Sequence, residues 1–94
     1  SRTCDCAAPV VKISLNKGDP KLTWDKVYNA DSYTVYRATT ANGTYSKMYT
    51  TKSASYTNTS AVAGKTYYYK VFANCSRSSY ATSASSNVVH ILAK

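Results

Sequence analysis

The sequence predicts an all-β protein, a seven-stranded antiparallel β-sandwich. Short segments alternate apolar and polar residues with the period of two that marks a half-buried strand. Turn-forming residues separate these segments at regular intervals, and no segment shows the 3.6-residue periodicity of a helix. The composition also favours strands, because the chain has ten Tyr and many Ser and Thr but no Glu. Short strands without intervening helices favour a sandwich over a parallel α/β sheet.

The predicted strands cover residues 11–15, 21–25, 32–38, 45–50, 55–57, 66–74 and 87–92. The first starts directly after Pro9, with Val11, Ile13 and Leu15 on its buried face. Residues 16–20 then form a turn around Gly18 and Pro20.

The second strand places Leu22 and Trp24 on one face, and a polar loop over residues 26–31 follows it. The third strand begins at Ser32. It ends in the segment 39–43, where Asn42-Gly43 is a strong hairpin signal because both residue types tolerate positive φ. The fourth strand returns from this hairpin.

The fifth strand is short, around Tyr56, and the sixth is the long segment 66–74 with three consecutive Tyr. Since successive side chains of a strand point to opposite faces, the sixth strand divides into two sets. One face carries Tyr67, Tyr69, Val71 and Ala73, and the other carries Tyr68, Lys70 and Phe72. A Ser-rich loop leads to the last strand.

Length and charge exclude several classes of protein. The 94 residues suffice for one domain. The net charge of +8 comes from scattered Lys and Arg, without the basic stripe of a nucleic-acid-binding protein, and no apolar run is long enough to insert into a membrane. Adhesion to an anionic cell wall or membrane surface stays compatible with this charge.

No catalytic constellation is visible. The sequence has no paired carboxylates, no nucleophile with a base and a single His, His90, which falls in a strand pattern. Three Cys and one distant His do not make a structural zinc site. We therefore predict neither an enzyme nor a metal or other cofactor.

Three motifs carry a resemblance to the fibronectin type III family, which extends from Pro9 to about Leu92. They are Leu22-Thr23-Trp24, the Tyr-x-Val-x-Arg segment that starts at Tyr33, and the Gly-x-x-Tyr-x-x-x-Val segment that starts at Gly64. The resemblance implies an immunoglobulin-like topology with sheets A-B-E and C'-C-F-G, and a tyrosine corner at Tyr67. It places the structural core at Trp24, Tyr33, Val35, Tyr67, Tyr69 and Val71. Ala61 and Ala63 stand where the family often has Leu and Pro, which implies a smaller plug beneath the corner.

The sequence of residues 36–45 and 63–71 resembles the branch of this family that is found in secreted and surface proteins of Gram-positive bacteria, including glycan-degrading enzymes. The resemblance implies a linker over residues 1–8 and one domain over residues 9–94. It further implies an extracellular, secreted or cell-surface module that spaces or joins domains, often in tandem copies. We expect a monomer whose partners are neighbouring domains of the same polypeptide.

The three cysteines imply one bridge and one remaining thiol in a secreted domain. In the fibronectin type III fold the N-terminus enters beside the loops that include the end of strand F, so the resemblance places Cys75 near Cys4 and Cys6. A Cys4–Cys75 disulfide is the first choice and Cys6–Cys75 the alternative. Three reduced thiols are the third possibility.

The alternative function is binding of carbohydrate or protein, including a polysaccharide or a surface protein. By strand parity, the outer face of sheet C'-C-F-G gathers Tyr36, Tyr68, Lys70 and Phe72. Exposed aromatic rings beside a Lys can stack on a sugar or a peptide. Cross-strand aromatic pairs also stabilise sheets without any ligand. The F–G loop, which contains Arg77 and Tyr80, is a second candidate surface.

Overall fold

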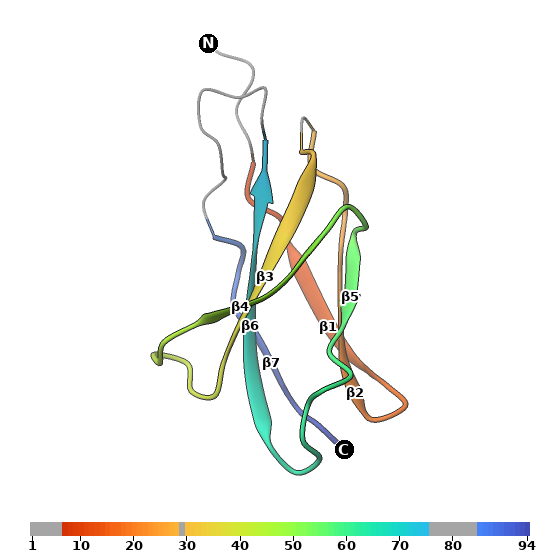
Figure 1. Ribbon diagram of the computed structural model, residues 1–94, viewed down its shortest axis with the longest axis vertical. Coiled ribbons are helices and arrows are strands. Elements are labelled where there is room, and N and C mark those ends of the chain that lie inside the picture. The colour runs from red at the N-terminus through yellow and green to blue at the C-terminus, as the bar shows by residue number, and fades with distance from the viewer. Residues whose placement is uncertain (1–6, 29, 76–84) are drawn as a thin grey trace.

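The protein is described by a computed structural model over residues 7–28, 30–75 and 85–94. This part of the chain forms strands only, connected by turns and loops (Figure 1). The strands are β1 (Val11–Asn16), β2 (Asp19–Trp24), β3 (Ser32–Ala38), β4 (Ser46–Thr51), β5 (Ser55–Thr57), β6 (Thr66–Asn74) and β7 (Val89–Leu92).

The strands form two antiparallel sheets, in the orders β1-β2-β5 and β4-β3-β6-β7. The two sheets pack as two layers (Figure 1). This architecture confirms the predicted seven-stranded sandwich. The order also reproduces the expected division into sheets A-B-E and C'-C-F-G.

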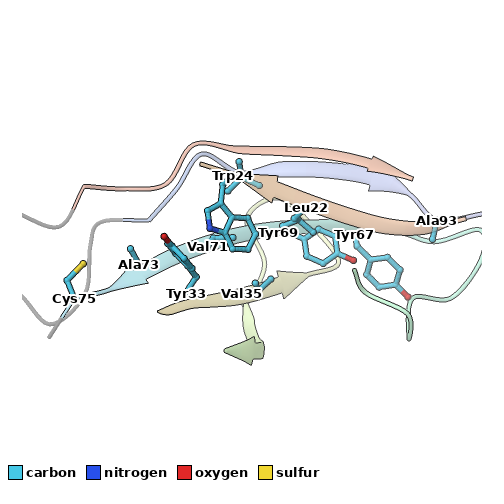
Figure 2. Close-up of a cluster of buried hydrophobic side chains, with 11 residues drawn as sticks. Leu22, Trp24, Tyr33, Val35, Tyr67, Tyr69, Val71, Ala73, Cys75 and Ala93 are labelled. Carbon is cyan, nitrogen blue, oxygen red and sulfur yellow. The ribbon is translucent and has the colours of Figure 1, made fainter. Parts of the chain in front are cut away.

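The core lies between the sheets and is built mainly from the alternating side chains of β6. Along β6 the buried positions alternate strictly with half-buried ones. The buried apolar cluster consists of Val11, Leu22, Trp24, Tyr33, Val35, Tyr67, Tyr69, Val71, Ala73, Cys75 and Ala93. Figure 2 shows these side chains between the two layers, with Cys75 at one end and Ala93 at the other. The six residues expected in the structural core are all buried here.

The hairpin geometry differs from the sequence-based expectation. Positive φ occurs at Lys17 (54°) and Gly18 (88°), which form the two-residue turn between β1 and β2. Asn42 and Gly43 do not adopt it, although the predicted hairpin forms, since β3 and β4 pair on either side of this loop. They lie instead in a seven-residue loop, residues 39–45, in which the Gly43 amide donates to the Thr40 carbonyl at 3.2 Å. A loop of that length reverses the chain without a strained turn.

Some strand boundaries and the burial of one residue differ from the sequence-based expectation. β2 begins at Asp19, because the β1–β2 ladder continues to the pair Asn16 and Asp19 and leaves only two residues for the turn. Leu15, expected inside, is 36% exposed, because β1 there extends beyond the core cluster. β7 begins at Val89 and not at Asn87, whose side-chain amide hydrogen-bonds the backbone of Val11.

The two long sides of the sandwich are closed differently. On one side the Asn87 amide bridges the sheets, since its Oδ1 accepts from the Val11 amide at 2.8 Å and its Nδ2 donates to the Val11 carbonyl at 2.9 Å. This side chain imitates a strand pair between β1 and the chain that enters β7. On the other side lie the two remaining edge strands, β4 and β5, which are not hydrogen-bonded to each other.

Candidate functional site

The outer face of the four-stranded sheet brings together the residues predicted to bind a ligand. Tyr36 comes from β3, and Tyr68, Lys70 and Phe72 come from β6, where Tyr36 pairs with Lys70 in register. The structure adds Tyr45 from the loop before β4 and His90 from β7. We call these six residues the outer-face cluster. His90 is exposed, and the other five are half-buried.

The members of the outer-face cluster contact one another in pairs. The Tyr36 and Phe72 rings meet edge to face at 5.4 Å and 76°. The Lys70 ammonium lies 4.4 Å from the Tyr45 ring centroid and 5.7 Å from that of Phe72. The rings of Tyr68 and His90, which are cross-strand partners, stack at 5.1 Å and 23°.

These contacts use much of the surface that a ligand would need. The nearly parallel rings of Tyr68 and His90, with centroids 5.1 Å apart, each occupy part of one face of the other. Lys70 is likewise occupied by two rings. Aromatic pairs contribute about 0.5–1.5 kcal/mol beyond area burial, and cation–π contacts contribute similar amounts. The cluster therefore has a sufficient structural purpose in holding β3, β6 and β7 together.

Inside the sandwich, two tyrosine hydroxyls fix loops to the core. Tyr67 accepts a hydrogen bond from the Val62 amide at 2.9 Å, which is the geometry of a tyrosine corner across the β5–β6 connection. Tyr33 accepts from the Val27 amide at 2.8 Å and packs edge to face on Trp24 at 5.3 Å. The Trp24 Nε1 is buried without a hydrogen-bond partner among the described residues.

Sequence reasoning missed the role of Asn58, a polar residue that follows β5 and is fully buried. Its Oδ1 accepts from the Tyr69 hydroxyl at 2.6 Å and from Arg37 Nη1 at 2.9 Å. Its Nδ2 donates to Ser60 Oγ at 2.9 Å, and its backbone amide donates to the Pro20 carbonyl at 2.9 Å. Asn58 thus joins both sheets. Because its side chain is buried, the Asn-Thr-Ser triplet at 58–60 is not accessible for glycosylation in the folded chain. Neither the hydrophobic periodicity nor the motif spacing of the sequence predicts a buried Asn with several hydrogen-bond partners.

The electrostatics of this network follow from burial. Burial raises the pKa of the Tyr69 hydroxyl well above its ordinary value, although the nearby Arg37 guanidinium opposes the shift. Arg37 also lies over the Tyr67 ring, with its Cζ 4.6 Å from the centroid. Tyr69 consequently stays protonated and donates to Asn58 over the physiological pH range.

Another aromatic contact lies on the side of the sandwich opposite Asn87, between the edge strands β4 and β5. Tyr49 of β4 stacks on Tyr56 of β5, with centroids 5.5 Å apart and planes 21° apart. We call these two residues the edge pair. It joins the edge strand of one sheet to the edge strand of the other, and Tyr49 is 54% exposed. Strand parity alone assigned Tyr49 no role.

Other predicted features fall outside the described residues. Cys4 and Cys6 do, so the bridge to Cys75 stays a prediction, while Cys75 itself is fully buried at the end of β6. Arg77 and Tyr80 of the F–G loop also lie outside.

Over residues 7–28, 30–75 and 85–94, no three His, Cys, Asp or Glu side chains group as metal ligands. The same residues contain no helix long and apolar enough to cross a membrane. A hollow of about 180 Å³ lies at the end of β2 and is lined by Val10, Lys12, Thr23, Trp24 and Asp25. It contains a single carboxylate and a single amine, which do not form a nucleophile with its base.

Several solved structures are similar to the chain. An Fn3-like protein from Clostridium thermocellum is 30% identical, with a TM-score of 0.78 and 90% of each chain covered. A β-1,2-glucanase from Parabacteroides distasonis is 23% identical (TM-score 0.79), and the match covers 94% of this chain but 13% of the glucanase. The pectate lyase PelI from Erwinia chrysanthemi is 20% identical (TM-score 0.77), with 89% and 27% covered. Neither a protein-family model nor a curated protein sequence matches the chain.

Proposed function

Since the chain belongs to the fibronectin type III family, we propose that it is a non-catalytic module that spaces or joins domains of a larger secreted or cell-surface protein. The family is found in multidomain proteins, and in the glucanase and the pectate lyase the matched domain is a small part of the chain. The similarity to a clostridial protein supports a bacterial origin.

The observation that carries the proposal is the position of the two ends of the fold. The C-terminal end is held beside the β1–β2 turn, because the Lys94 amide donates to the Gly18 carbonyl at 2.9 Å. The Ala93 amide donates to the Lys65 carbonyl at 2.9 Å, and the Gly64 amide donates to the Ala93 carbonyl at 2.8 Å. The segment that leads into β1 lies at the opposite end of the sandwich (Figure 1). Domains attached at both ends would therefore follow one another along its long axis.

A tandem chain tests this proposal. Two copies of residues 1–94 joined directly would use residues 1–8 as the linker between two domains. Small-angle X-ray scattering should give an end-to-end particle about twice as long as the single copy, and both should melt at the same temperature. A compact particle with the copies side by side, or a single copy that is unfolded in isolation, would contradict the spacer role.

For the outer-face cluster we propose a structural role ahead of carbohydrate or protein binding, because its rings and Lys70 contact one another. Titration of cell-wall and plant polysaccharides against the labelled domain distinguishes the two. Saturable shifts of the Tyr36, Tyr68 and Phe72 resonances would show binding at this face. Unchanged resonances over the whole titration would leave the cluster its structural role alone.

A further inference from the structure

We propose that the edge pair, Tyr49 on Tyr56, is a stacking site for a carboxylated sugar of an acidic polysaccharide. This inference goes beyond the spacer role and does not depend on it. It rests on the exposure of one ring, the rigid support beneath it, and the distribution of charge around it.

Tyr49 combines exposure with support in a way that the other described tyrosines do not. It is 54% exposed even though Tyr56 lies against one side of its ring, so the exposed part includes the opposite face and the rim. Tyr28 is more exposed, at 80%, but its ring stacks on no other aromatic ring of the described residues. The four tyrosine and phenylalanine rings of the outer-face cluster are half-buried, and only its His90 is exposed. Tyr49 therefore offers an open ring face that is already held in place.

The support beneath Tyr49 is anchored in the core. Tyr56 packs against the core cluster, and its register partner in β2 is Leu22, which is fully buried. The register partner of Tyr49 in β3 is Val35, also fully buried. Because both backbones are fixed by buried neighbours, a ligand would not have to order the platform, which lowers the entropic cost of binding.

A flat, open platform suits a polymer better than a small molecule, because small ligands usually require a concave pocket that buries most of their surface. One face of a pyranose ring carries hydrogens bound to carbon, which pack on the electron-rich face of an aromatic ring. The chain beyond Tyr49 supplies hydroxyl groups, since Thr51, Ser53 and Ser55 follow within six residues. The Ser53 amide donates to Thr51 Oγ1 at 3.0 Å, so this turn has a defined shape.

The charge around the edge pair favours an anionic sugar over a neutral one. No Asp or Glu occurs anywhere in β3, β4, β5, β6 or β7. Lys47 and Lys52 are exposed and lie two and three residues from Tyr49 along the chain. The acids among the described residues are confined to β2 and the β2–β3 connection, as Asp19, Asp25 and Asp31. A carboxylated sugar on Tyr49 would meet positive charge without a competing carboxylate from these strands.

Nuclear magnetic resonance titration of the labelled 94-residue chain with trigalacturonate tests the proposal. We expect saturable shifts centred on Tyr49 and Tyr56. Tyr49→Ala should weaken binding at least tenfold, and Tyr49→Phe, which keeps the ring, should retain it. Tyr28→Ala removes a still more exposed tyrosine and serves as the matched control, with unchanged affinity. Thermal melting of each variant establishes that it is folded.

Two further probes identify what is recognised. The methyl ester of trigalacturonate keeps the sugar but loses the charge, and it should bind much more weakly. Poly-glutamate keeps the charge without the sugar, and it should not shift Tyr49. Equal binding of the methyl ester, equal binding of poly-glutamate at Tyr49, or an unchanged affinity of Tyr49→Ala would each overturn the proposal. So would a titration without saturable shifts at the edge pair.

Discussion

Replacing the buried Asn58 with Ala should strongly destabilise the domain. Asn58 is fully buried and makes three side-chain hydrogen bonds, to Arg37 and Tyr69 of the four-stranded sheet and to Ser60 of its own loop. Removing its amide leaves the Tyr69 hydroxyl without its acceptor in the core. It also deprives Arg37 and Ser60 of their partners.

The magnitude follows from the burial of each partner. A buried hydroxyl without an acceptor costs about 1–3 kcal/mol, and the bonds to Ser60 and to the half-buried Arg37 each contribute about 0.5–1 kcal/mol after allowance for solvent. Together these losses amount to about 2–5 kcal/mol. That is a large share of a typical unfolding free energy of about 5–15 kcal/mol. For a domain of this size each kcal/mol lowers the melting temperature by roughly 4–8 °C, so Asn58→Ala should lower it by roughly 8–40 °C.

Urea denaturation followed by tryptophan fluorescence measures the effect, because Trp24 is the only Trp in the chain. Ser60→Ala, which loses one of the three bonds, is the matched control and should cost about 1 kcal/mol. The double variant Asn58→Ala, Tyr69→Phe should be less destabilised than the sum of the single variants by at least about 1 kcal/mol, because the two share a bond. A loss below about 1 kcal/mol for Asn58→Ala, or additivity in the cycle, would refute the reasoning.

Three further predictions concern other parts of the fold. Because burial raises the pKa of Tyr69 in the folded chain, its contribution to stability is complete below its ordinary pKa of 10.0 and is lost as pH rises above that value. Urea midpoints should therefore fall between pH 9 and 11.5, and Tyr69→Phe should reduce the slope; an unchanged slope would contradict this assignment. Tyr67→Phe removes the acceptor of the Val62 amide and should cost about 1–2 kcal/mol in the same assay, whereas a neutral result would deny the corner an energetic role. The non-reduced protein should alkylate at one cysteine, with Cys75 bridged to Cys4 or Cys6, and reduction should lower the melting temperature; three alkylated thiols by mass spectrometry would disprove the bridge.

Sequence patterns predicted the strands well, most clearly where buried positions alternate along the strand, as in β2 and β6. Alternation in 66–74 placed the buried and half-buried side chains of β6 without error. Turn geometry was predicted less well. The Asn42-Gly43 dipeptide tolerates positive φ but does not require it, and the number of residues between the paired strands decided which turn adopts it.

The candidate sites show the same limit. Parity placed Tyr36, Tyr68, Lys70 and Phe72 on one face, because parity depends only on the strand that carries each residue. It could not show that these rings cover one another, nor that Tyr49 and Tyr56 meet across the open side of the sandwich. Contacts between sheets depend on how two layers pack, and no local pattern encodes that packing.

The sequence by itself determined the strands, the faces they bury and the family resemblance, because periodicity, turn residues and a few motif positions are local properties. Only the tertiary structure decided the role of Asn58, which looks like an ordinary loop residue in the sequence. Its burial becomes favourable only because the loop that carries Asn58 and Ser60 packs where the paired strands β3 and β6 present Arg37 and Tyr69 to its amide. The exposed ring of the edge pair has the same origin, because two edge strands that are not hydrogen-bonded to each other are brought side by side by the core beneath them.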